Sequence, residues 1–172
     1  MKAVVKHVLL VLLAMAMGYN NAIADPVNIN ITGNVVASPC VVNNNNSDLN
    51  VDLGTSIQAN TLETAGAGTT PKAFNLLLTS CPVGTSNVTV TFTGTAAAAP
   101  QTNMYLNTGV ATPLAVELSS GGTILGNSST LTQAVQADRT VTYALSARAV
   151  TPTGNVMPGS IIALVQANFT YN

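Results

Sequence analysis

The fold is decided by Gly159-Ser-Ile-Ile-Ala-Leu-Val-Gln-Ala-Asn-Phe-Thr-Tyr-Asn172, the last fourteen residues of the chain. Apolar residues recur there at every second position, and a period of two predicts a β-strand with one buried face. The predicted inward-facing residues are Ala163, Val165, Ala167, Phe169 and Tyr171. No turn and no further strand follow in the sequence, so we expect the outer edge of this strand to be unpaired.

A second alternating segment lies near the other end, at Val27-Asn-Ile-Asn-Ile-Thr-Gly-Asn-Val35. Its alternate positions are Val27, Ile29, Ile31, Gly33 and Val35. A chain with a spare strand at one end and an open edge at the other can polymerise, because an extended segment can add to an exposed sheet edge. The alternative is that residues 27–35 form the first strand of their own domain and pair internally.

The N-terminus has the features of a secretory signal peptide over residues 1–24. Lys2, Lys6 and His7 make a positive head, residues 8–17 are ten apolar residues, and Ala22-Ile-Ala24 is a small-residue cleavage site. Ten apolar residues are too few to cross a bilayer, which takes about twenty. Removal of 24 residues from 172 leaves a mature chain of 148, which we expect to be exported.

The charge and composition of the mature chain exclude several classes of protein. Three basic residues remain, Lys72, Arg139 and Arg148, against six acidic ones, so the net charge is −3. A chain with this charge and no basic patch is not expected to bind nucleic acid. Low charge with many Val, Leu, Ile and Ala residues is the opposite of a disordered composition. A length of 148 fits one domain.

Cys40 and Cys81 are the only cysteines. An even pair of cysteines in an exported chain predicts a disulfide, which here closes a loop of about 40 residues. The alternative is a pair of free, buried thiols.

Short strands separated by turn signals recur from end to end. The predicted strands cover residues 35–42 (interrupted by Pro39), 49–53, 73–81, 87–93, 114–119, 140–150 and 161–171, and residues 56–64 can form a short helical piece. About seven strands at this spacing favour an all-β, two-sheet sandwich of immunoglobulin-like type. No internal repeat or change of composition marks a domain boundary.

The residues needed for common catalytic chemistry are missing. The only histidine, His7, leaves with the signal peptide, so the mature chain lacks a histidine base or metal ligand. Asp48 and Asp52 are the only two acids close in sequence, and we interpret them as turn residues rather than as a calcium or glycosidase site. We therefore expect no enzyme, no metal and no cofactor. Tryptophan is absent, which disfavours a sugar-binding site without excluding one.

Several motifs occur in a fixed order along the mature chain. They are the extension at 27–36, Ala37-Ser-Pro-Cys40, Val51-Asp-Leu-Gly54, Leu78-Thr-Ser-Cys-Pro-Val-Gly84, and a C-terminal strand with glycine fourteenth from the end and tyrosine penultimate, here Gly159 and Tyr171. With these motifs in this order, the sequence resembles the pilin subunits that the chaperone–usher route assembles. It is most similar to the minor adaptor subunits of the type 1 tip fibrillum.

The resemblance implies a domain organisation and a site. Residues 25–36 would be a donor-strand extension, and 37–172 an immunoglobulin-like domain that lacks its final strand. A strand from a chaperone or a neighbouring subunit would complete this domain. The implied donor residues are Val27, Ile29, Ile31, Gly33 and Val35, with Gly33 facing a groove position where only a small residue fits. The implied acceptor edge and chaperone-recognition residues are Gly159, Ala163, Val165, Ala167, Phe169 and Tyr171.

The resemblance also implies a function and partners. The chain would be a structural fimbrial subunit in cell adhesion, exported through the periplasm to a fimbrium on the bacterial surface. Its partners would be a periplasmic pilus chaperone, an outer-membrane usher and neighbouring pilin subunits, with the tip adhesin as one candidate neighbour. Two alternatives stay open: a major fimbrial rod subunit, and a secreted monomeric sugar-binding β-sandwich.

Overall fold

A computed structural model describes residues 27–35 and 38–172 of the chain. The predicted signal peptide (1–24) and the remaining ends of the predicted extension (25–26 and 36) lie outside the described residues. The chain divides into two units at Val35, and each is described by itself. Residues 27–35, called the extension below, form neither helix nor strand and are exposed throughout. No helix within the described ranges is long and apolar enough to cross a membrane.

The described domain, residues 38–172, is almost entirely β-structure. Its strands are β1 (Val41–Val42), β2 (Lys72–Thr79), β3 (Asn87–Gly94), β4 (Tyr105–Leu106), β5 (Ala115–Ser120), β6 (Thr123–Ile124), β7 (Thr130–Ala134), β8 (Val141–Val150) and β9 (Val165–Tyr171). Two short 3₁₀ helices, η1 (Asn43–Asn45) and η2 (Ala59–Leu62), interrupt the loops. The second of these is the helical piece predicted within residues 56–64.

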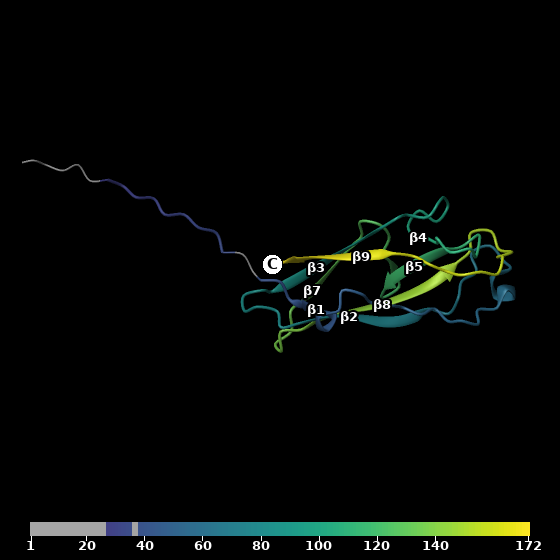
Figure 1. The fold of residues 1–172 in the computed structure, drawn as a ribbon, viewed down its shortest axis with the longest axis horizontal. Helices are drawn as coiled ribbons and strands as arrows, with labels where there is room; N and C mark the ends of the chain where they lie inside the picture. Colours follow the sequence, from purple (N-terminus) through teal and green to yellow (C-terminus); the bar gives the residue numbers. More distant parts are fainter. Residues whose placement is uncertain (1–26, 36–37) are drawn as a thin grey trace, which may run out of the picture. The chain divides into compact units, whose positions relative to one another are not determined.

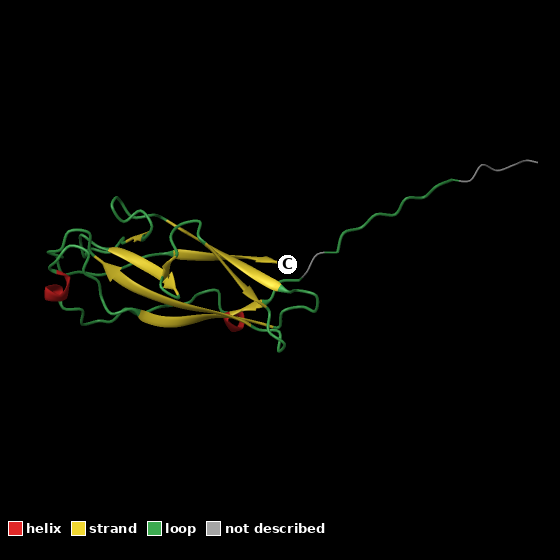
Figure 2. Cartoon of the chain, turned by 180° about the vertical axis from the view of Figure 1, so that it is seen from behind, coloured by secondary structure: helices red, strands yellow, loops and turns green. Residues whose placement is uncertain are grey.

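The strands form two sheets in facing layers (Figures 1 and 2). The larger sheet has the order β1-β2-β8-β5-β4, with β6 also paired to β5, and the smaller sheet has the order β7-β3-β9. Neighbouring strands are antiparallel throughout the domain. The predicted all-β, immunoglobulin-like sandwich with an incomplete set of strands is confirmed.

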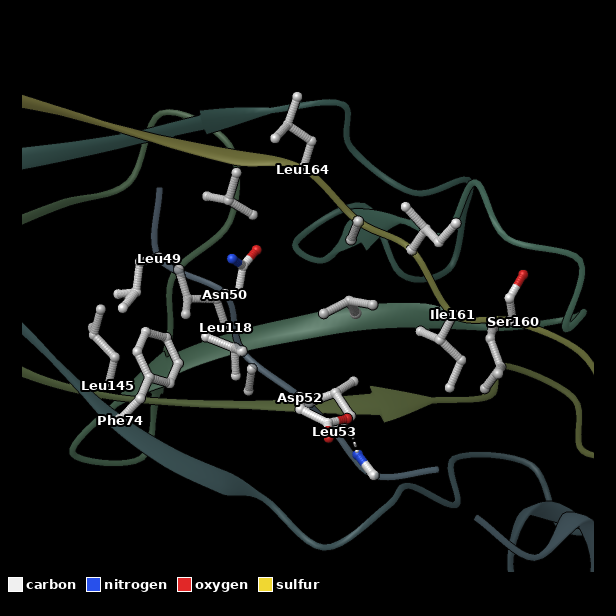
Figure 3. Close-up of a pocket in the computed structure, with 18 of the residues that line it drawn as sticks. Leu49, Asn50, Asp52, Leu53, Phe74, Leu118, Leu145, Ser160, Ile161 and Leu164 are labelled. Atoms are coloured by element: carbon white, nitrogen blue, oxygen red, sulfur yellow. Dashed lines mark hydrogen bonds between the residues drawn. The ribbon is translucent and has the colours of Figure 1, made fainter. Parts of the chain in front are cut away.

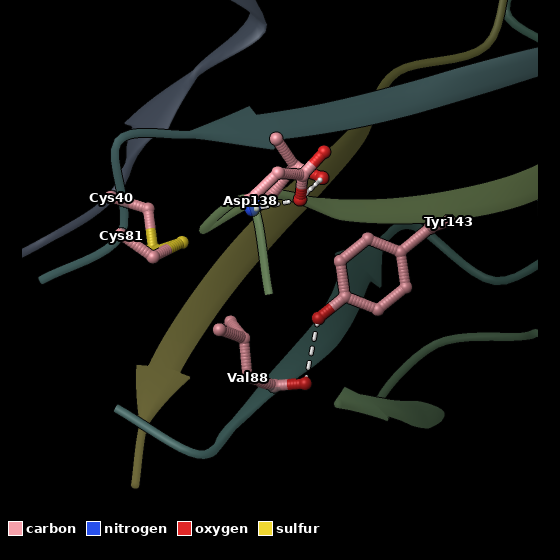
Figure 4. The surroundings of a disulfide bond; sticks show 6 residues. Cys40, Cys81, Val88, Asp138 and Tyr143 are labelled. Atoms are coloured by element: carbon pink, nitrogen blue, oxygen red, sulfur yellow. Dashed lines mark hydrogen bonds between the residues drawn. A yellow bond between two sulfur atoms is a disulfide. The ribbon is translucent and has the colours of Figure 1, made fainter. Parts of the chain in front are cut away.

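The core lies between the two sheets, where alternate residues of each strand meet. β3 has the burial pattern that its sequence predicts, with Val88, Val90 and Phe92 buried and the threonines between them partly exposed. Tyr143 of β8 crosses the core, and its hydroxyl donates to the Val88 carbonyl of the other sheet at 2.7 Å (Figure 4). Burial raises the pKa of Tyr143 to about 12, so it stays a hydrogen-bond donor at neutral pH.

Three predicted strands differ from the structure. The strand predicted at 161–171 begins only at Val165. Of the described residues within 35–42, only Val41–Val42 form a strand, and Pro39 just before them has no N–H to donate to a ladder. Residues 49–53 form no strand, because no neighbouring segment of the described domain pairs with their backbone. Three strands were not predicted from sequence at all: β4 and β6, which are two residues long, and β7, which is mostly polar.

The disulfide between Cys40 and Cys81 is present (Figure 4). It joins the residue before β1 to the loop that follows β2, and both sulfurs are buried in the main core. The bridge reinforces a short β1–β2 pairing of only two residue pairs, Val41 with Thr79 and Val42 with Leu78.

Removing this disulfide should lower the free energy of unfolding by about 4 kcal/mol, from the loop-entropy relation for its separation of 41 residues. Chemical denaturation of the Cys40→Ala/Cys81→Ala variant measures the loss. Reductant should bring the wild-type protein to the same value and leave the variant unchanged. Two free thiols in protein taken from the periplasm, detected by mass spectrometry, would contradict the assignment.

Candidate strand-acceptor groove

A long groove opens between two segments of the described domain that lie far apart in sequence (Figure 3). Residues 46–59 form one wall, and residues 157–169 form the other. The floor consists of apolar side chains from β2, β3, β5 and β8, namely Phe74, Leu76, Phe92, Val116, Leu118, Leu145 and Ala147. Its volume of about 1370 Å³ exceeds the 300–1,000 Å³ typical of small-molecule pockets. The groove is large enough for a segment of polypeptide.

The β9 wall presents an open sheet edge. Asn172, just past β9, exchanges two backbone hydrogen bonds with Asn87 at 3.0 Å, so its N–H and C=O point toward β3. Hydrogen-bonding direction alternates along an antiparallel strand. The backbone groups of Val165, Ala167, Phe169 and Tyr171 therefore point the other way, to the side where no described strand lies.

The same four residues also direct their side chains inward, but they are only half-buried. On the neighbouring β3, the inward side chains are at most 2% exposed. The two strands belong to one sheet, and the difference arises because β3 has a neighbour on both sides and β9 on one. Burial raises the pKa of the Tyr171 hydroxyl above its ordinary value.

The opposite wall is a second unpaired edge, and it was not foreseen from the sequence. Residues 50–53 alternate, with Val51 and Leu53 partly buried and Asn50 and Asp52 exposed, whereas Leu49 is 41% exposed. Within the described domain, the backbone of residues 47–57 bonds only to local side chains, such as Gly54 N–H to the Asp52 carboxylate at 2.8 Å. A strand inserted in the groove would find backbone partners on both sides.

The end of the groove near Gly159 is held by a side-chain hub. The buried Asn107 amide accepts from Gly109 N–H at 2.9 Å and Ile162 N–H at 2.8 Å, and donates to the Ala111 carbonyl at 2.6 Å. A Cβ added at Gly159 would lie 2.6 Å from the Ala111 nitrogen, so this position needs glycine because of close packing. Gly159 therefore allows the close packing that positions the start of the β9 wall. The sequence motif, a glycine fourteenth from the end, does not by itself predict this role.

The extension carries large apolar side chains that are exposed. Val27, Ile29, Ile31 and Val35 are 79–98% exposed. Gly33 continues their alternation without a side chain, and a Cβ there would meet no atom within 4 Å. Exposed β-branched residues at every second position are typical of a strand that lacks its sheet.

The described domain offers little for metal or catalytic chemistry. Asp48 and Asp52 are exposed, and Asp52 caps the turn at Gly54. Within residues 27–35 and 38–172, no group of three or more His, Cys, Asp or Glu side chains is placed to hold a metal ion.

Comparison with known proteins identifies the family. The fimbrial protein family model matches residues 29–172. The chain is 37% identical to protein FimG of Escherichia coli K12 over 168 residues, 96% of each chain. It is 38% identical to the fimbrial-like protein FimF of Salmonella typhimurium LT2 over 101 residues, 59% of this chain and 57% of that one. The chain belongs to the fimbrial protein family and is a structural subunit of a surface fimbria.

Solved structures show the same fold. The P pilus rod subunit PapA superposes with a TM-score of 0.66 at 19% identity, covering 78% of this chain and all of that one. A subunit of a chaperone–usher pilus superposes with a TM-score of 0.64 at 21% identity, covering 86% of this chain and 96% of that one. At these identities the likeness concerns the fold alone.

Proposed function

We propose that this subunit is a minor adaptor of a fimbrial tip and that it polymerises by donor-strand exchange. It accepts a neighbour's strand in the groove and donates residues 25–36 to the subunit ahead of it. The observation that carries the proposal is the groove itself, which has an unpaired edge on each side and an apolar floor. An exposed apolar strand in the same chain supplies a matching ligand.

The dimensions of the extension and the groove agree. Nine extended residues span roughly 30 Å and the eleven residues 161–171 roughly 36 Å, at about 3.3 Å per residue. Four large side chains of the extension would enter the apolar floor, each worth about 1.5–3 kcal/mol on burial. Gly33 would lie where the groove has room only for a backbone, as the resemblance implies.

Chain connectivity supports a direction for the accepted strand. The subunit's own extension joins the domain just before Cys40, which lies in the core cluster against which Tyr171, at the far end of β9, packs. A fibre that continues in one direction places the following subunit at the other end, near Gly159. The accepted strand would then leave the groove beside residues 159–164 and run antiparallel to β9.

The same groove explains the proposed partners. Before assembly, a periplasmic chaperone would fill it with a strand of its own, because an open apolar edge is a template for aggregation. At an outer-membrane usher, the extension of the next subunit would replace the chaperone strand, and one candidate for the subunit ahead is the tip adhesin. We propose no catalytic activity, since structural pilins act by assembly and the only histidine is His7.

Gel filtration of the mature protein without chaperone tests the proposal. We expect concentration-dependent polymers, which an excess of a synthetic 25–37 peptide converts to a folded monomer. Peptide at 1,000 times its dissociation constant should raise the free energy of unfolding by about 4 kcal/mol. A monomer that folds cooperatively without peptide, and whose free energy of unfolding does not change when peptide is added, would contradict the proposal. It would favour a secreted monomeric domain.

The placement at the tip rests on the sequence resemblance to minor adaptor subunits, and protein FimG is a fimbrial relative at 37% identity over 96% of the chain. Immunogold labelling of fibres would distinguish an adaptor from a rod subunit. A few gold particles confined to fibre ends are expected. Labelling along the whole shaft would make the chain a major rod subunit.

A further inference from the structure

Exposed apolar side chains concentrate at one end of the described domain. Seven large hydrophobic residues of the domain are exposed, and five of them lie in two segments, 106–110 and 157–164. These five, called the end patch below, are 39–77% exposed and are Leu106, Val110, Met157, Ile162 and Leu164. Scattered exposed hydrophobics are ordinary on a protein surface, but a cluster marks an interaction site.

Hydrogen bonds hold the two segments of the end patch side by side. One backbone bond joins them directly, from Thr108 N to Ile162 O at 2.8 Å. Two more start just past the first segment, Ala111 N to Ser160 O at 3.0 Å and Met157 N to Thr112 O at 2.8 Å. The patch is therefore built on a backbone network that the Asn107 hub reinforces. Its side chains are presented on a fixed frame.

The end patch adjoins the groove, whose wall includes Met157, Ile162 and Leu164, but its exposed side chains face outward. Ile162 and Leu164 are exposed, whereas Ala163 and Val165 between and after them are half-buried, so the two sets of side chains point in opposite directions. Figure 3 shows Leu164 pointing away from the groove and Ile161 pointing into it. A strand in the groove would leave the outward side chains of the patch uncovered.

The opposite end of the domain carries one exposed hydrophobic residue. Val83 is 91% exposed in the turn after Cys81, and Cys81 is bonded to Cys40, where the extension joins the domain. The eight residues of β3 separate this turn from Gly94, roughly 25 Å away beside the end patch. Val83 thus lies at the end of the domain from which the donated strand departs.

We propose that the end patch docks the body of the following subunit of the fibre, and that the Val83 turn of that subunit contacts it. The inference rests on the proposed donor-strand exchange. Only four residues lie between Val35 and Cys40, so over five Cα-to-Cα steps the following domain starts at most about 17 Å from the accepted strand. That strand leaves the groove beside residues 159–164, which carry part of the patch.

The chemistry of the two surfaces is compatible. No charged residue occurs in 104–112, in 156–164 or in 79–88, so bringing them together desolvates no ion. The contact is of the heterologous, head-to-tail kind that propagates along an open fibre. Because the tether is short, the effective concentration is in the millimolar range, and a small apolar contact is enough to hold the bodies together.

Amide hydrogen exchange on two matched complexes tests the docking. Both use the full mature chain with Ile29→Asp and Ile31→Asp as the acceptor, so that it cannot donate. In the first complex the synthetic 25–37 peptide fills its groove. In the second, the groove holds the extension of another mature chain, whose own groove contains the peptide. The accepted strand is the same, and only the second complex adds a body.

We expect the amides of residues 106–112 and 157–162 to exchange about tenfold more slowly in the second complex, which corresponds to a docked population of about 90%. Equal exchange in the two complexes would overturn the proposal while leaving donor-strand exchange intact. Failure of both the peptide and the second chain to enter the groove would instead contradict the proposed function.

Substitutions identify the contacting residues. Ile162→Thr/Leu164→Thr in the acceptor, or Val83→Thr in the following chain, should each remove the extra protection, and the two together should do no more than either alone. The matched control is Val83→Thr in the acceptor, where this turn faces away from the contact and protection should persist. Loss of protection with the control variant would overturn the assignment of Val83.

Discussion

Replacing Ile29 and Ile31 by aspartate should give a subunit that folds and accepts a strand, yet cannot be joined to the subunit ahead. Each substitution removes about 1.5–3 kcal/mol of apolar burial, so the double change should weaken binding by about 100- to 10,000-fold. Any carboxylate that stayed ionised in the apolar groove would add several kcal/mol to this loss. Competition between the wild-type and double-aspartate 25–37 peptides for the peptide-free groove measures the effect.

The control for this experiment lies in the same segment. Asn28→Asp/Asn30→Asp adds the same two charges at the alternate positions, which would face away from the groove, and should leave binding nearly unchanged. Equal weakening of binding by the two double substitutions would contradict the assignment of residues 27–35 as the donor strand. Should the double-aspartate protein lose the chaperone as completely as a groove variant does, residues 27–35 would be an ordinary strand of their own domain.

Phe169→Asp should have the largest effect on the acceptor side. The Phe169 ring is half-buried beside the groove, and its centroid lies 6.4 Å from that of the buried Tyr143. Truncation of such a ring costs about 3–5 kcal/mol, and the new charge adds to this. We expect at least a tenfold drop in the amount of subunit that copurifies with a tagged chaperone, followed by degradation in the periplasm.

Thr170→Asp is the matched control for Phe169→Asp, since Thr170 neighbours Phe169 on β9 but is exposed on the opposite face. It should copurify at the wild-type level. Tyr171→Ala provides a milder second variant in case Phe169→Asp prevents folding altogether. Equal chaperone capture by Phe169→Asp and Thr170→Asp would show that the inner face of β9 does not recognise the chaperone.

The elements that could be predicted from sequence are those whose pattern is local. The period-two alternation of β3 and of residues 161–171 reports burial on one face, and a turn follows or precedes each strand. β4 and β6 are too short to carry such a pattern. β7 is mostly exposed, with Leu131 as its only large apolar residue, so its sequence resembles that of a loop.

The groove shows a different limit. The edge of β9 could be foreseen, because the alternation of residues 161–171 predicts a strand with one buried face and the resemblance implies an unpaired edge there. The wall at 47–57 could not, since residues 49–53 carry the alternation of a strand but have no ladder partner in the described domain. The Asn107 hub joins residues 55 positions apart in sequence, and only the folded chain brings them together.

The position of the disulfide has a mechanical consequence. When a fibre built as proposed is stretched, the pull enters each domain through the extension and reaches Cys40. From there the tension can pass through the sulfur–sulfur bond to Cys81, so a pull at Cys40 cannot draw out residues 41–80 from their N-terminal end. That sheltered loop contains the short β1 strand and the groove wall at 47–57. Tension on the extension therefore cannot unfold the groove wall at 47–57 from its N-terminal side.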